Sequence, residues 1–401
     1  MLGGVIVVGA VPVLAQDTPA PRTEVTAPEN APVKPMTDEQ KRLDFLDKRL
    51  APKVATDFPG ALASVGEFLE ANPNLDPWQR VLVISNSGTS LYFNTPEARR
   101  KAVADSAIGV LDEGLKEVEA AKNPDPSVRA RDIKEYSDHK IQILIAEKRT
   151  LEAAKVLDAC WPSMGSSTDL FSTMQWCRHW CDVRDQQNQP QQATDGLIKL
   201  LEQLLPQRDQ FPWDVSLVLS DEFLRQGKDD EALSWAKTTF TLCSFDEWAI
   251  GQATPAVTHC LSAHELSVAK ANAFAKAQVD PSAPNPLDAV SMPKFSTDAV
   301  KAQLADAHAD LSPRTRISRL LIVGDYRGAM LLARSQLVAD VSNQDNAREV
   351  ARVFKAKDGD IARANQFLAF YQQGQGENPV PAFLKETEAA GTTVATTASA
   401  Q

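Results

Sequence analysis

Apolar side chains recur every four residues on both sides of a glycine near the middle of the chain. This spacing is typical of one face of an α-helix. The glycine, Gly227, can adopt the left-handed conformation that ends a helix, and the acidic residues 229–231 favour the start of the next helix. The pattern therefore predicts two antiparallel helices joined by a tight turn. The repeating residues are Val215, Leu219 and Phe223 before the glycine, and Ala232, Ala236 and Phe240 after it.

A turn residue followed five positions later by alanine recurs along the chain. The steps between six such turns are 40, 39, 37, 60 and 35 residues, and the longest step contains a proline-rich insertion. Self-similarity at a nearly fixed period is typical of stacked helical repeats, and a small alanine lets the two helices touch closely. The clear copies are Gly227 with Ala232, Gly324 with Ala329 and Gly359 with Ala364; the weaker ones are Lys148 with Ala153, Asn188 with Ala193 and His264 with Ala269.

The residues Leu219, Phe223, Gly227 and Ala232, with their counterparts around Gly324 and Gly359, resemble the tetratricopeptide-like class of helical repeats. The resemblance implies an all-α fold, namely a right-handed α-solenoid of antiparallel helical hairpins. It also implies that the first helix of each hairpin lines a concave surface, where partner peptides lie. The low aromatic content of 6% and the scarcity of alternating strand patterns also favour an all-helical chain.

The chain is expected to divide into six segments. Residues 1–15 are apolar and end in Val-Leu-Ala, which resembles a signal peptide cut before Gln16. The protein is therefore expected to be exported, to the periplasm or the extracellular space, with no transmembrane span in the mature chain. The other segments are a disordered proline-rich linker at 16–36, helical repeats at 37–278, a proline-rich insertion at 279–296, C-terminal helical repeats at 297–385 and a disordered tail at 386–401.

Local signals refine this division. Thr37 with Gln40 forms a capping-box pattern that predicts the start of the first helix. Residues 85–95, SNSGTSLYFNT, are interpreted as a loop between helices. The insertion at 279–296 contains four prolines, which exclude a continuous helix. It is either a hinge between two halves or a long surface loop.

Charge narrows the classes of partner. The net charge of −11 and the pI near 5.1 argue against nucleic-acid binding, which needs a basic surface. A local basic excess nevertheless lies in the first helices of the last two clear repeats. It has two interpretations, a clamp for an acidic segment or carboxylate of a partner and an ordinary solvated helix face. The residues are Arg314, Arg316, Arg319, Arg348, Arg352 and Lys355.

The five cysteines are informative because an exported chain meets an oxidising compartment. Cys160 and Cys243 are each expected to end the second helix of a pair, and Cys177 and Cys260 each follow 17 residues later. This spacing predicts disulfides between Cys160 and Cys177, or Cys181, and between Cys243 and Cys260. The alternative is a set of buried free cysteines that act as small hydrophobic residues.

The sequence gives little support for a metal site or for an enzyme active site. Cys177 with Cys181, and Cys260 with His264, are spaced four apart and could together supply four zinc ligands, but helix packing explains the same residues. The chain has no GxSxG, HExxH or P-loop pattern. No metal or cofactor is predicted. Paired acids such as Asp229 and Asp230 are better explained as helix-start charges than as a general acid and base.

The sequence therefore predicts an exported, non-enzymatic scaffold that holds a protein or peptide partner on a solenoid surface. Two alternatives stay open. One is an all-helical exported enzyme that acts on envelope polymers or polysaccharide. The other is a structural envelope component that self-associates. The sequence does not specify the oligomeric state.

Overall fold

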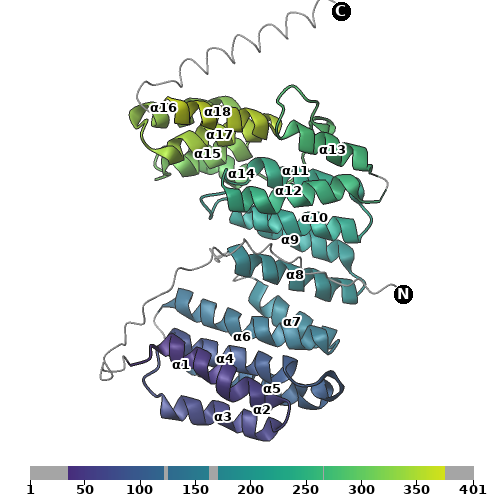
Figure 1. Cartoon of the computed structure of the whole chain (residues 1–401), viewed down its shortest axis with the longest axis vertical. Helices are drawn as coiled ribbons and strands as arrows, with labels where there is room; N and C mark the ends of the chain where they lie inside the picture. Colours follow the sequence, from purple (N-terminus) through teal and green to yellow (C-terminus); the bar gives the residue numbers. More distant parts are fainter. Residues whose placement is uncertain (1–34, 122–124, 162–169, 265, 375–401) are drawn as a thin grey trace, which may run out of the picture.

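The computed structural model describes residues 35–121, 125–161, 170–264 and 266–374. Every regular element in these ranges is a helix, so the all-α class is confirmed (Figure 1). None of these helices is long and apolar enough to cross a membrane. The expected signal peptide, most of the linker, the tail and the end of the C-terminal repeat region lie outside the described residues.

The elements follow one another with short connections. Thr37 caps the first helix with the expected capping box, in which its side chain and that of Gln40 each accept a hydrogen bond from the other's backbone nitrogen. The elements are α1 (Asp38–Asp44), the π-helix η1 (Phe45–Leu50), α2 (Ala51–Val54), α3 (Phe58–Ala71), α4 (Pro77–Phe93), α5 (Glu97–Ala120), α6 (Pro126–Ala146), α7 (Thr150–Cys160), α8 (Leu170–Gln186), α9 (Pro190–Leu204), α10 (Trp213–Arg225), α11 (Asp229–Leu242), α12 (Glu247–Ser262), α13 (Val268–Ala277), the 3₁₀ turn η3 (Pro286–Ala289), α14 (Asp298–Ala305), α15 (Pro313–Ile322), α16 (Tyr326–Ala339), α17 (Gln344–Asp358) and α18 (Ile361–Gln373).

From α4 to α13 the helices form two sets. The even-numbered helices α4, α6, α8, α10 and α12, here called the first helices, each contact the next member of their set. Each odd-numbered helix from α5 to α11 packs against the first helices before and after it, and α13 packs against α12. The pairs follow one another along the longest axis of the molecule (Figure 1). The core lies between the two sets, where the apolar faces of the helices meet.

Tight turns join the two helices of a pair. Six of the described residues have positive φ, and they are the six positions at which the sequence predicts turns. At Gly227 two backbone bonds close the first helix in a Schellman motif, from Lys228 N to Phe223 O and from Gly227 N to Leu224 O, both 2.9 Å long. The same two bonds form at Lys148 and Asn188, and they compensate the strain of about 1–2 kcal/mol in a left-handed residue with a Cβ.

The alanine that follows each turn packs against the partner helix, with one exception. Ala269 is exposed, so it is not the contact residue of the pair α12 and α13 as predicted. The buried contact residue lies two positions later. The reason is that Ser267 caps α13, which starts four residues after His264 rather than two. The fourth residue of α13 is Ala271, which is 7% exposed. In the other five pairs the fourth residue is the predicted alanine, which is fully buried: Ala153, Ala193, Ala232, Ala329 and Ala364.

The loop expected at residues 85–95 is also wrong, because α4 continues to Phe93. The small residues of this stretch allow close contact between helices and do not form a turn. Ser85 and Ser87 are fully buried, and a Cβ added to Gly88 would lie 2.7 Å from the side chain of Leu111 on α5. Serine and glycine are common in loops, but here they let α4 and α5 approach each other.

The proline-rich insertion is a surface segment held against α11. Lys237 of α11 donates hydrogen bonds to Leu287 O and Val290 O, at 2.7 and 2.6 Å. Earlier in the insertion, Asn285 Nδ2 donates a hydrogen bond of 3.3 Å to Gly359 O, at the turn between α17 and α18. The insertion therefore contacts helices on both sides of it in the sequence.

Candidate functional site

Polar, partly exposed side chains join α4 to α6. His139 of α6 lies between Thr89 of α4 and Glu135, one turn earlier on α6. Its Nδ1 contacts Thr89 Oγ1, and its Nε2 is 3.1 Å from Glu135 Oε1. Ser85 Oγ donates to the same Glu135 oxygen over 3.2 Å. The side chains of His139 and Glu135 are 15% and 26% exposed, so a partner in solution can reach them.

The same kind of contact joins α6 to α8 through Asp138. Its Oδ2 accepts hydrogen bonds from Gln142 and Gln175, each 3.0 Å long. Its Oδ1 lies 3.2 Å from His179 Nε2, but neither atom forms a well-aligned hydrogen bond. Both atoms are buried, so this contact joins α6 to α8 inside the protein.

Charged side chains continue the contacts from α8 to α10. Arg225 Nη1 lies 2.9 Å from Asp182 and 3.2 Å from Asp185. Asp221 precedes Arg225 by one turn. Burial raises the pKa of Asp221, while the charges of Arg178 and His259 oppose the rise.

These residues form one strip across four consecutive first helices, here called the polar seam. Four of its members are carboxylates, against one arginine and two histidines, so the seam is acidic at neutral pH. Sequence reasoning missed it, although the polar positions recur every three or four residues, as one helix face requires. The polar seam comprises Thr89, Glu135, Asp138, His139, Gln175, His179, Asp182, Asp221 and Arg225.

The predicted cationic clamp is wrong for three of its six residues. Arg319 and Arg352 are each 1% exposed and Lys355 is fully buried, so none of them faces a partner. Arg316 is half-buried. Arg314 and Arg348 are exposed, and they pair with Glu349 and Asp345 at 3.2 and 3.0 Å.

Two of the buried cations bind the end of α11 instead. Lys355 Nζ donates to Cys243 O at 2.7 Å and to Ser244 O at 3.3 Å, and Arg352 Nη2 donates to Leu242 O at 3.4 Å. The last carbonyls of a helix lack partners within it and carry partial negative charge. Burial lowers the pKa of Lys355, and the contact with Cys243 opposes this shift. These cations therefore dock α17 onto α11.

The predicted disulfides are not formed, and all five cysteines are buried thiols. Cys160 Sγ lies 3.4 Å from Ser137 Oγ, and Cys260 Sγ lies 3.3 Å from Ser220 Oγ. Burial raises the pKa of Cys260 to about 11, so its thiol is protonated at neutral pH and is a poor nucleophile. The cysteines therefore pack as small apolar residues, as in the alternative interpretation.

The four residues weighed as zinc ligands are not brought together. Over the described ranges, no three His, Cys, Asp or Glu side chains are placed to share a metal ion. Cys177, Cys181 and Cys260 are fully buried, whereas His264 lies at the surface, 3.8 Å from Asp229 Oδ1.

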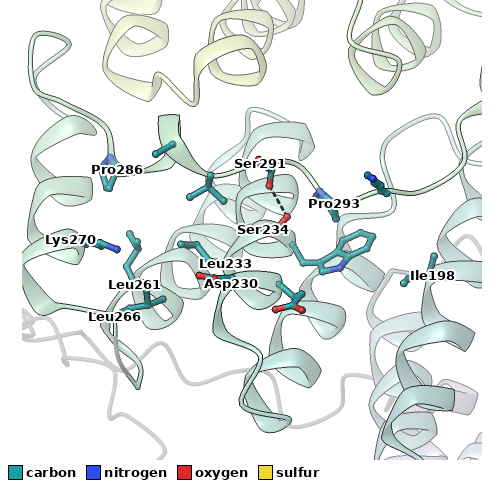
Figure 2. A pocket seen from close by; sticks show the side chains of 15 residues that line it. Ile198, Asp230, Leu233, Ser234, Leu261, Leu266, Lys270, Pro286, Ser291 and Pro293 are labelled. Carbon is teal, nitrogen blue, oxygen red and sulfur yellow. Dashed lines mark hydrogen bonds between the residues drawn. The ribbon is translucent and has the colours of Figure 1, made fainter.

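A groove of 790 Å³ lies between the insertion and the helices α11, α12 and α13 (Figure 2). Its apolar lining includes Leu233 and Trp235 of α11 and Leu261 of α12. Lys270 of α13 and Lys294 of the insertion also line it, together with the carboxylates Asp230 and Glu231 of α11. Its size and mostly apolar lining are typical of ligand-binding clefts.

No family model, curated protein or solved structure matches this chain. The functional inference therefore rests on the fold, the polar seam and the groove.

The buried carboxyl of Glu222, beside the seam, is expected to make stability depend on pH. Burial raises its pKa above the ordinary value of 4.5, Gln226 and Arg225 oppose the rise, and Asp185 adds to it. Between 4.5 and the raised pKa, the folded state binds more protons than the unfolded state. The free energy of unfolding should therefore fall as pH rises through this window, and Glu222→Gln should flatten the slope.

Urea unfolding of both proteins, measured from acid to neutral pH, checks this prediction. Asp195→Asn is the control, because Asp195 is exposed on α9. If the free energy of unfolding of Glu222→Gln has the same pH dependence as that of the unchanged protein, the Glu222 carboxyl is not the source of this dependence.

Proposed function

We propose that this chain is an exported, non-enzymatic scaffold, a right-handed tetratricopeptide-like α-solenoid whose first helices hold a protein or peptide partner. The two sets of helices, the repeated left-handed turns and the buried alanines support the solenoid. The observation that carries the binding role is the polar seam. A strip of partly exposed polar groups across four helices suits an extended chain better than a compact small molecule.

The acidity of the seam specifies the chemistry of the partner. Glu135, Asp138, Asp182 and Asp221 contribute carboxylates from three helices. Arg225 already pairs with three carboxylates, those of Asp182, Asp185 and Glu222. A partner segment that carries lysine, arginine or amide donors therefore complements the seam. This proposal differs from the clamp interpretation of the basic residues, which called for an acidic segment or carboxylate in the partner.

Variants of the seam test this function. The double change Asp182→Asn and Asp221→Asn keeps side-chain size and removes two charges from α8 and α10. We expect binding of the partner to weaken at least about tenfold, because each lost charge contact costs affinity. The partner would be captured from the exported fraction of the source organism, and cross-linking followed by mass spectrometry would map its contacts.

The matched control removes two charges from the second helices, Glu152→Gln on α7 and Asp195→Asn on α9. This control should capture the same partner as the unchanged protein, with cross-links on α6, α8 and α10. Equal capture by the seam variant and the control would contradict the proposal. If light scattering shows only copies of this chain assembling, a self-associating component replaces the scaffold.

A further inference from the structure

Residues 285–296, here called the strap, lie on α11 in the way that a bound peptide lies on a receptor. Side chains of α11 hold the strap by its backbone. Lys237 binds two carbonyls, as described above, and Ser234 Oγ donates to Ser291 O over 2.7 Å (Figure 2). Glu202 of α9 accepts from Ser296 N at 2.6 Å. Contacts to backbone groups hold an extended chain largely independently of its sequence.

Two apolar side chains anchor the ends of the strap. Leu287 is 1% exposed. The Phe295 ring stacks on Trp235 of α11 at a centroid distance of 5.8 Å and lies 6.3 Å from the Phe211 ring. These anchors are eight residues apart, or about 26 Å in a fully extended chain. The surface therefore selects an aliphatic side chain at one end and an aromatic one at the other.

Between the two anchors the strap is held mainly by its backbone. The residues between the two anchors are partly or fully exposed. One flank of the strap faces the 790 Å³ groove rather than packed protein. After the 3₁₀ turn η3 (Pro286–Ala289), Pro293 favours an extended backbone in the rest of the strap. The strap therefore resembles a peptide ligand bound to the outside of the packed helices.

We propose that the α9 and α11 surface is a second peptide-binding site, and that the strap is its built-in occupant. The partner is an extended peptide segment with the pattern of the strap, an aliphatic residue followed eight positions later by an aromatic residue that comes two after a proline. It binds by displacing the strap, because it needs the hydrogen bonds that Lys237 and Ser234 now donate to the strap backbone. The groove gives the incoming segment room beside the strap.

This site is separate from the polar seam. The seam lies on the first helices, whereas the strap lies on α11, a second helix of its pair. The inference therefore goes beyond the proposed function and does not depend on it.

The probe is a fluorescent peptide with the sequence of residues 285–296, added to the full chain. Phe295→Ala removes the aromatic anchor of the strap and frees the site. We expect this variant to bind the peptide at least about tenfold more tightly than the unchanged protein, whose site is occupied. Adding Lys237→Met to the variant should abolish this gain. The same peptide with alanine in place of Phe295 should bind neither protein.

Circular dichroism and thermal unfolding establish that each variant is folded. Leu287→Ala, which removes the other anchor, is the second variant in case Phe295→Ala does not fold. Equal binding by variant and unchanged protein would overturn the proposal and assign the peptide to the groove alone. Absence of binding to both folded variants would also overturn it. Asp182→Asn with Asp221→Asn should leave peptide binding unchanged, so failure of one proposal is distinguishable from failure of the other.

Discussion

Replacing Arg208 with methionine is expected to lower the free energy of unfolding by about 3–5 kcal/mol. Arg208 Nη1 donates to both carboxylate oxygens of Asp214, at 2.7 and 2.9 Å, and its Nη2 donates to Thr173 Oγ1 at 2.9 Å. Asp214 is fully buried in the first turn of α10. Without the guanidinium, its charge remains inside the protein with no opposite charge to pair with. Thermal or urea unfolding measures the loss.

Two further measurements test the cause of this loss. The double change Arg208→Met and Asp214→Leu removes both charges, and it should recover most of the lost stability because no unpaired ion remains. Burial raises the pKa of Asp214, and Arg208 opposes the rise. The single variant should therefore lose less stability in acid, where Asp214 is protonated. A double variant as unstable as Arg208→Met would contradict this explanation.

Leucine in place of Ala232 is expected to cost about 3 kcal/mol, at the upper end of the usual cost of overpacking. Ala232 is fully buried at the contact between α10 and α11. A larger side chain must push the two helices apart or adopt a strained rotamer. The change in the urea midpoint, with an unchanged slope, measures the effect.

The pair α12 and α13 supplies the matched control. Ala269→Leu occupies the same position relative to its turn, but its side chain is exposed, so stability should change by less than about 0.5 kcal/mol. Ala271→Leu should resemble Ala232→Leu, because Ala271 is the buried fourth residue of α13. If Ala269→Leu were the more damaging change, the register of this pair would be wrong.

The helices and their turns could be predicted because their causes are local. Glycine at positive φ and an apolar residue every four positions act within one or two turns of helix. One error, at Ala269, had a local cause, the cap that Ser267 gives to α13. The others arose where a contact with another helix decided the outcome. Ser85 and Gly88 have the composition of a loop, yet they lie inside α4. Gly88 leaves room for Leu111 of α5, and Ser85 hydrogen-bonds Glu135 of α6.

The candidate site was harder to predict than the fold for the same reason. The charge of Lys355 is visible in the sequence, but its acceptors belong to Cys243 and Ser244, on another helix pair. Its burial therefore could not be deduced from its own helix. The polar seam was missed because polar residues at helical spacing also describe an ordinary solvated face. Only the contact of His139 with Thr89, and of Asp138 with Gln175, distinguishes the two.

The bond from Lys355 to Cys243 joins residues 112 positions apart. Arrays in which each unit touches only its neighbours can gain or lose units during evolution with little penalty. Here the deletion of α17 and α18 would strand carbonyl groups at the end of α11. Descendants of this gene that keep α11 should therefore also keep α17.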